Sequence, residues 1–67
     1  MNEDVKLLIS RIYADAAMHN IKAWQIADRS GIGKNVLSLW RNEKASPTLE
    51  NYVKVRRALD DLINERA

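Results

Sequence analysis

The stretch Ser30-Gly-Ile-Gly-Lys-Asn-Val-Leu-Ser-Leu-Trp40 contains both glycines of the 67-residue chain. Gly31 tolerates the left-handed backbone conformation that ends a helix, so we expect the helix over residues 23–30 to stop there. Leu37 and Trp40 follow Gly33 and lie three residues apart, which predicts a second short helix that buries both side chains. The stretch therefore predicts a helix, a turn and a helix over residues 23–42.

The glycines also raise the alternative of a phosphate-binding loop, because Lys34 follows Gly33 directly. A nucleotide-binding loop of that type needs a glycine where Asp28 stands and a serine or threonine where Asn35 stands. The dinucleotide-binding pattern needs a third glycine where Val36 stands. Both nucleotide-binding motifs are therefore excluded.

The remaining chain also predicts helices. Apolar residues at helical spacing indicate a helix over residues 3–18, closed by His19 and Asn20. Thr48, directly after Pro47, is the expected N-cap of a last helix. The apolar stripe of that helix comprises Leu49, Tyr52, Val53, Val55, Leu59, Leu62 and Ile63. Whether the helix bends near Leu59 stays open, and no alternating pattern typical of strands occurs. We expect one all-α domain over residues 1–67.

Composition excludes several classes of protein. The chain has no cysteine, which excludes disulfides and thiolate metal sites. No apolar run approaches the roughly 20 residues that span a bilayer, and the first residues lack the basic start of a signal peptide. These features predict a cytoplasmic protein without membrane contact.

Charge is unevenly distributed along the chain. Residues 22–57 carry eight Lys or Arg against three acids, whereas the two ends are net acidic and the whole chain is +2. A basic middle segment indicates a polyanionic partner, and an ordinary solvated surface is the alternative.

Enzyme chemistry finds no support in the sequence. His19 is the single histidine, so neither a serine relay nor a transition-metal site can be assembled around it. The acid pairs Glu3-Asp4 and Asp60-Asp61 are sequence neighbours, which point about 100° apart on a helix and do not converge. We expect no catalysis, no cofactor, no metal and no small-molecule ligand.

Two blocks in residues 21–59 resemble the helix-turn-helix family of phage repressors, Cro proteins and Xre-type regulators. The first block has Ile21, Ile26-Ala27, Gly31-Ile32, Leu37, Trp40 and Asn42 at that family's characteristic positions. The second, Pro47-Thr-Leu-Glu-Asn-Tyr-Val-Lys-Val-Arg-Arg-Ala-Leu59, is similar to the family's Pro-Ser-Leu-Glu-Asn-Leu-Leu-Lys-Ile-Ala-Lys-Ala-Leu pattern. The resemblance implies a compact lambda-repressor-like bundle of about five helices, with residues 33–41 as the recognition helix.

The resemblance also implies which residues contact DNA. The base-facing positions are Gly33, Lys34, Asn35, Ser38 and Leu39. Asn35 suits adenine and Leu39 suits a thymine methyl, although contact with the last helix is the alternative for Leu39. The expected phosphate contacts are Lys22, Trp24, Lys34, Arg41 and Lys44. Packing against the first helix or the turn is the alternative for Trp24.

The sequence departs from the family pattern at several positions. Lys22 stands at a cap position that is often serine or threonine, and Ala23 replaces a common glutamine. Ala16 and Arg41 stand where the family often pairs an arginine with a glutamate, so Arg41 is available for a phosphate, Asp15 or Glu43. Asp60 replaces a usual glycine, which lets the last helix continue.

The resulting functional hypothesis is a sequence-specific regulator of transcription, most simply a phage-type or bacterial repressor. One recognition helix contacts too few base pairs for useful specificity, so we expect a homodimer on a palindromic double-stranded operator. Leu59, Leu62 and Ile63 are the expected dimer surface, or else they close the core against the first helix. The alternative function is a protein-binding helical module, such as an antitoxin-like or antirepressor partner, and a nonspecific nucleic-acid binder is a third possibility.

Overall fold

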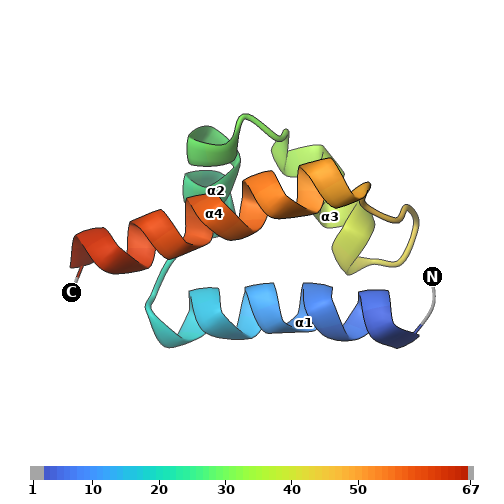
Figure 1. Ribbon diagram of the computed structural model, residues 1–67, viewed down its shortest axis with the longest axis horizontal. Coiled ribbons are helices and arrows are strands. Elements are labelled where there is room, and N and C mark those ends of the chain that lie inside the picture. The colour runs from blue at the N-terminus through green and yellow to red at the C-terminus, as the bar shows by residue number, and fades with distance from the viewer. Residues whose placement is uncertain (1–2, 67) are drawn as a thin grey trace.

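The computed structural model describes residues 3–66, and within them it contains four helices and no strand. They are α1 (Glu3–Met18), α2 (Ala23–Ser30), α3 (Lys34–Arg41) and α4 (Leu49–Arg66). Figure 1 shows α1 beside α4, with the short helices α2 and α3 behind α4. The predicted all-α class is confirmed for the described residues, as are the bounds of the first two helices. None of these four helices is long and apolar enough to cross a membrane.

The turn after α1 is fixed by backbone hydrogen bonds and by burial. Asn20 adopts a φ of 56°, in the left-handed region. The Ile21 N–H donates to the carbonyl of Ala16 at 2.8 Å, and the Asn20 N–H donates to Ala17 at 3.2 Å. This pair of bonds is a Schellman motif, and its expected apolar contact is present because Ile21 and Ala16 are both buried core residues. The predicted closing role of Asn20 is confirmed.

Gly31 ends α2 with a φ of 76°, as its position in the sequence predicts. Its N–H donates to the Ala27 carbonyl at 3.0 Å, and the Ile32 N–H donates to the Ser30 hydroxyl at 3.1 Å. Ile32 is partly buried against the core. The chain then enters α3 after Gly33, so only three residues separate the two short helices.

The end of α3 uses a left-handed residue that is not glycine. Glu43 has a φ of 61°, the Lys44 N–H donates to Leu39 at 2.8 Å, and the Glu43 N–H donates to Trp40 at 3.2 Å. This is the same motif that ends α1. The sequence does not predict this turn, because a glutamate gives no signal for a left-handed conformation.

The last helix is continuous. The Thr48 hydroxyl accepts a hydrogen bond from the Asn51 N–H at 3.2 Å, which confirms Thr48 as the N-cap. From Leu49 the helix runs without interruption to Arg66, so the implied count of about five helices is wrong for the described residues. Residues 49–66 contain neither glycine nor proline, and Asp60 occupies the position where the family pattern has a glycine.

The core lies where the four helices meet. Its buried members come from all four helices and the turn after α1: Ile9, Ile12, Ala16, Ile21, Ile26, Leu37, Trp40, Val55 and Leu59. Leu49 was expected in the buried stripe of the last helix, but it is 79% exposed. It is the first residue of α4 and lies beyond the edge of the core.

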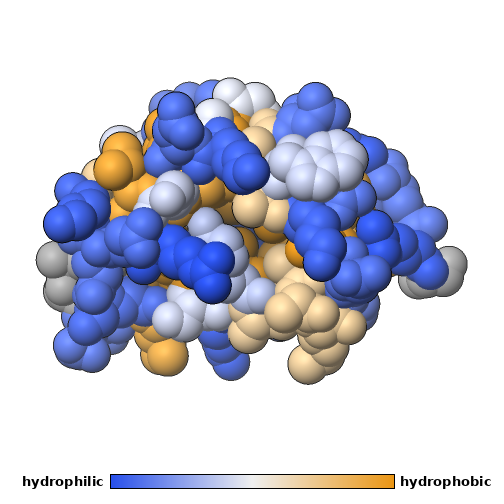
Figure 2. Space-filling view, turned by 180° about the vertical axis from the view of Figure 1, so that it is seen from behind, coloured by the Kyte–Doolittle hydropathy of each residue, from blue (hydrophilic) through white to orange (hydrophobic). Residues whose placement is uncertain are grey.

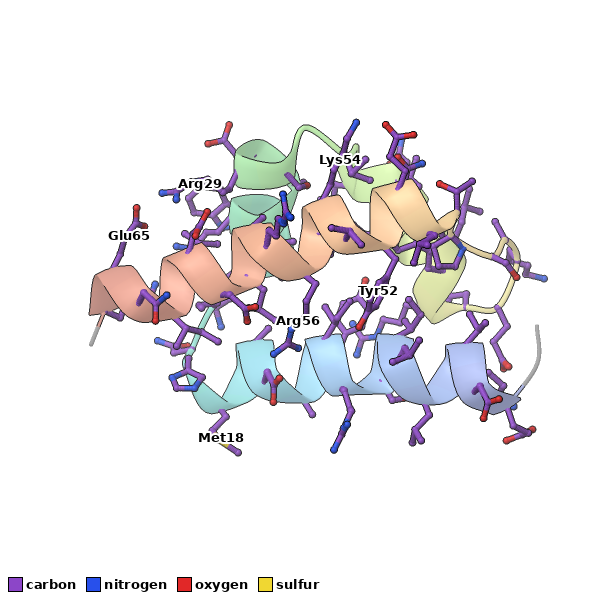
Figure 3. All side chains as sticks on the ribbon, in the orientation of Figure 1. Met18, Arg29, Tyr52, Lys54, Arg56 and Glu65 are labelled. Atoms are coloured by element: carbon purple, nitrogen blue, oxygen red, sulfur yellow. The ribbon has the colours of Figure 1, made fainter. Side chains whose placement is uncertain are left out.

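Two ion pairs join helices that are distant in the sequence. Arg29 of α2 contacts Glu65 of α4 at 2.6 Å (Figure 3). Arg56 of α4 contacts Asp15 of α1 at 2.8 Å. The hydrogen bond that Arg56 donates to the Asp15 carboxylate raises the pKa of Arg56. These side chains are partly exposed, so the pairs orient α4 more than they stabilise the fold.

Candidate nucleic-acid interface

The α2–α3 unit, comprising α2, residues 31–33 and α3, presents one polar outer side. Its inner side is anchored by Ile26, Leu37 and Trp40, each at most 3% exposed. The Lys22 N–H at the start of α2 donates to the Gln25 side-chain oxygen at 2.7 Å, which orders the first turn. The orientation of the outer side is therefore set by the core and not by a loop.

The five base-facing positions expected from the sequence are all exposed. Lys34 and Asn35 stand in the first turn of α3, and neither side chain makes a hydrogen bond or ion pair within residues 3–66. The Ser38 hydroxyl accepts a hydrogen bond from the Asn42 amide at 3.3 Å. Leu39 is 44% exposed and is not part of the core. Gly33 at the N-cap and the other four residues within α3 are thus all accessible on the part of this helix that faces away from the core.

Gly33 has no conformational or steric requirement for glycine within the described chain. Its φ of −60° is open to any residue, and a Cβ added there would meet no atom within 4 Å. The missing side chain leaves open space beside the first turn of α3. A close approach by another molecule is a common reason for glycine at such a position.

Within the described chain, four cations around the α2–α3 unit lack acidic partners, whereas Arg29 near the end of α2 binds Glu65 at 2.6 Å. Lys22, Lys34, Arg41 and Lys44 make no ion pair within residues 3–66. By contrast, the cations at positions 6, 29, 54 and 56 are each neutralised by a carboxylate. Arg11, Arg57 and Arg66 of α1 and α4 also make no ion pair within residues 3–66, so four of the seven unpaired cations lie around the α2–α3 unit. This group of four suits an anionic partner.

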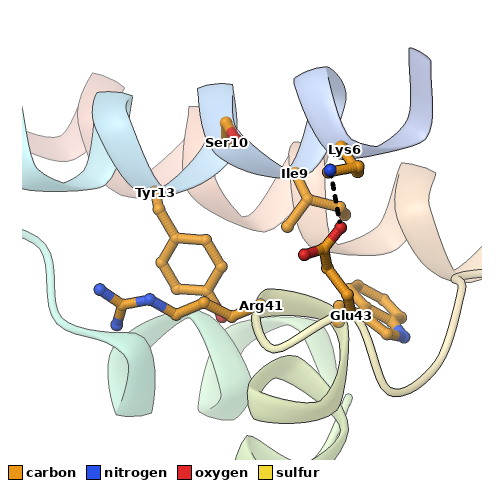
Figure 4. A pocket seen from close by; sticks show the side chains of 7 residues that line it. Lys6, Ile9, Ser10, Tyr13, Arg41 and Glu43 are labelled. Carbon is orange, nitrogen blue, oxygen red and sulfur yellow. Dashed lines mark ion pairs between the residues drawn. The ribbon is translucent and has the colours of Figure 1, made fainter. Parts of the chain in front are cut away.

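Arg41 lies over an aromatic ring at the other border of the unit. Its guanidinium carbon is 4.9 Å from the centre of the Tyr13 ring, in a hollow of about 300 Å³ between α1 and the end of α3 (Figure 4). Its two expected acidic partners are occupied elsewhere, because Asp15 binds Arg56 at 2.8 Å and Glu43 binds Lys6 at 3.0 Å. Arg41 is thus held towards α1, while its side chain remains accessible.

Tyr13 supports this arrangement from α1. Its hydroxyl donates to the Leu37 carbonyl at 2.9 Å, so α1 is tied directly to the middle of α3. Burial raises the pKa of Tyr13 above its usual value, and the charge of Arg41 opposes that rise. No signal in the sequence indicated this contact, which joins residues 24 positions apart.

Trp24 is 59% exposed and does not belong to the core, so neither a phosphate contact nor packing beside the turn is excluded for it. Its indole borders a shallow hollow shared with Gly31, Gly33 and Lys34. Asp28 borders the same hollow, and the sequence did not predict it as a site residue. Its position one helical turn after Trp24 was the signal that places both on one side of α2.

Figure 2 shows the molecule from behind, which is the side of α2 and α3. Hydrophilic residues cover most of this face, and apolar side chains gather between them near its centre. The described residues contain no group of three or more potential metal ligands. The face offers charge, hydrogen-bonding groups and a few apolar contacts, which are the chemical features of a nucleic-acid interface.

Leu59 does not belong to any accessible surface. It is 0% exposed, so it closes the core and is not available as a dimer contact. Leu62 and Ile63 are partly buried against the same core. Of the two roles that the sequence left open for these residues, the core role is therefore the one observed for Leu59.

Comparison with known proteins yields no match to a family model, to a curated protein or to a solved structure.

Proposed function

We propose that this protein is a sequence-specific double-stranded DNA-binding regulator whose α3 enters the major groove. The observation that carries the proposal is the set of four cations around α2 and α3 that make no ion pair within residues 3–66, on a side that also exposes Asn35 and Leu39. A two-turn helix, a glycine turn and a second short helix suit this mode of docking.

Base selection is assigned to the first and middle turns of α3. The Asn35 amide can donate and accept together at adenine, and Lys34 can reach a guanine or a phosphate. Leu39 covers a thymine methyl, and Ser38 adds a hydroxyl. Gly33 allows the start of α3 to approach the duplex closely.

Phosphate contacts are assigned to the cations at the borders of the unit. Lys22 stands at the start of α2, where free backbone N–H groups also favour an anion. Arg41 is the last residue of α3, and Lys44 lies in the loop that follows. The Trp24 indole can donate one further hydrogen bond to a phosphate. These contacts supply affinity and salt dependence, while base choice comes from α3.

The biological role that follows is regulation of transcription in the cytoplasm of a bacterial cell or a phage-infected host. Repression is the simplest form, because a bound protein blocks access to DNA without any further domain. Two copies on a palindromic operator would double the number of base contacts.

The experiment that tests this function is duplex binding measured over a range of salt concentrations. We expect affinity to fall steeply with salt, and Lys34→Ala to lower both the affinity and the slope by about one phosphate contact. Asn35→Ala is expected to relax base preference while leaving the slope unchanged. Arg66→Ala is the matched control, because it removes the same charge at the far end of α4.

Binding that is indifferent to salt and to both α3 substitutions contradicts the proposal. That outcome would favour the protein-binding helical module. Equal affinity for unrelated duplexes, with the salt slope intact, would identify a nonspecific nucleic-acid binder.

A further inference from the structure

The start of α1 and the first residue of α4 form an apolar surface that DNA binding does not use. Leu7, Leu8 and Leu49 are 62%, 40% and 79% exposed, and we call these three residues the leucine patch. Leu8 and Leu49 line one apolar hollow together with Pro47 and Tyr52. Figure 1 shows the starts of α1 and α4 at the same end of the molecule. Leu7 stands next to Leu8 on α1 but does not line the apolar hollow. Exposed leucines beside an apolar hollow indicate an interaction surface.

Two opposite charges flank the patch along α1. Asp4 precedes Leu7 by three residues and Arg11 follows it by four, so all three share one face of the helix. Asp4 and Arg11 are exposed, and neither forms an ion pair within residues 3–66. The face therefore presents an acid, a leucine and a base in order from the start of α1.

This order of charges is complementary to itself. In two antiparallel helices related by a two-fold axis between positions 7 and 8, position 4 of each copy faces position 11 of the other. Leu7 of one copy then meets Leu8 of the second, and Asp4 meets Arg11 twice. A second copy of this chain supplies an acid and a base at this spacing and in the required order.

We propose that the leucine patch docks onto the same patch of a second copy of this chain, with the two α1 helices antiparallel. The proposal does not rest on DNA binding, because every contact it uses lies outside α2 and α3. The segment between the paired charges is only about 10 Å long, so the contact is small and the association weak. Two copies held close on one DNA molecule would associate more readily.

The position of the patch relates it to the DNA-binding unit. Leu49 begins α4 directly after the loop that follows α3, and that loop lies at the same end of the molecule as the start of α1 (Figure 1). In this proposal the dimer surface consists of α1 and Leu49, and the buried Leu59 takes no part in it.

The test is sedimentation equilibrium without DNA, over a wide range of protein concentration. The wild-type chain is expected to self-associate in a concentration-dependent way. Asp4→Arg places arginines at both ends of the patch and Arg11→Asp places aspartates there, so each variant alone is expected to remain monomeric. An equimolar mixture of the two variants is expected to associate, because every pair across the two-fold axis is then opposite in charge.

The double variant, with Asp4→Arg and Arg11→Asp in one chain, is expected to regain self-association. It carries the same Asp4→Arg change as the first single variant, so its recovery separates loss of docking from loss of helix stability. Lys34→Ala is the control that leaves self-association unchanged. Circular dichroism of every variant monitors the fold.

A wild-type chain that stays monomeric at all concentrations overturns the proposal. Single variants that associate as strongly as the wild type overturn it as well, as does a mixture that stays monomeric. None of these results bears on duplex binding by α3, which is measured separately.

Discussion

At position 43 a glutamate occupies a backbone conformation that favours glycine. Its φ of 61° completes the motif that ends α3, and its side chain binds Lys6 at 3.0 Å. A Cβ in the left-handed region is unfavourable, so the protein retains strain at the junction between α3 and the following loop.

Replacing this residue tests the strain directly. Glu43→Gly and Glu43→Ala both remove the ion pair with Lys6, but only glycine relieves the left-handed conformation. We expect Glu43→Gly to be more stable than Glu43→Ala by about 1 kcal/mol in the free energy of unfolding, measured by chemical denaturation. Equal stability of the two variants would show that this junction carries no strain.

Asp28 is the acid that shares a hollow with Lys34. If this side of α2 lies beside the duplex, its carboxylate repels phosphates, so Asp28→Asn is expected to raise duplex affinity, most strongly at low salt. Asp4→Asn, at the start of α1 and outside the α2–α3 unit, is the control and should change affinity little. An Asp28→Asn protein with unchanged affinity would contradict the position of this hollow beside DNA.

Tyr13 predicts the direction of one pH effect. Burial raises its pKa above the usual 10.0, so the folded chain retains the phenolic proton when the unfolded chain loses it. The stability that this group contributes is complete below pH 10.0 and declines as pH rises through its folded pKa. Chemical denaturation at increasing alkaline pH should therefore show a steeper loss of stability for the wild type than for Tyr13→Phe. Parallel losses in the two proteins would contradict the assigned pKa shift.

At the scale of elements, sequence signals within a few residues were sufficient to predict where most helices begin and end. Asn20, Gly31 and Thr48 each fix a helix end through hydrogen bonds to residues at most five positions away, and the sequence predicted all three. Glu43 makes the same kind of turn, but its chemistry gives no sign of it. Asp60 in place of a glycine indicated that α4 can continue, as it does to Arg66, although a bend near Leu59 was left open.

Gly33 offers a prediction that separates helix stability from DNA binding. A serine at this N-cap can accept a hydrogen bond from the Val36 N–H, so Gly33→Ser is expected to be at least as stable as the wild type. The added side chain also fills the space beside α3, so duplex affinity is expected to fall. Thermal unfolding and duplex titration of the same variant measure both effects. Unchanged affinity would show that this space does not face DNA.

At the scale of the whole molecule, the contacts that the sequence could not supply are those between distant residues. Three contacts illustrate this: Arg41 stacks on Tyr13, Asp15 pairs with Arg56, and Glu65 pairs with Arg29. The two residues of each contact lie 28 to 41 positions apart along the chain. No local pattern specifies such partners, although the charges themselves are visible in the sequence. The outward placement of α3 was predictable, because it follows from the spacing of its buried residues.

The surfaces of the molecule also differ in whether a local pattern or a contact between distant residues creates them. The basic middle segment indicated an anionic partner, and the structure adds that the cations near α3 lack acidic partners within residues 3–66. The leucine patch was not predicted, because Leu7 and Leu8 follow the helical pattern of α1 while Leu49 comes from the start of α4. Its members meet only in the folded chain.

The measurement that tests the central claim most directly is selection of bound duplexes from a random pool, carried out in parallel with wild-type protein and Asn35→Ala. We expect the wild type to recover a palindromic motif with a defined half-site spacing. The variant should recover the same spacing with preference lost at one base pair in each half-site. Recovery of no common motif by the wild type, or of an identical motif by the variant, would contradict the assignment of base reading to α3.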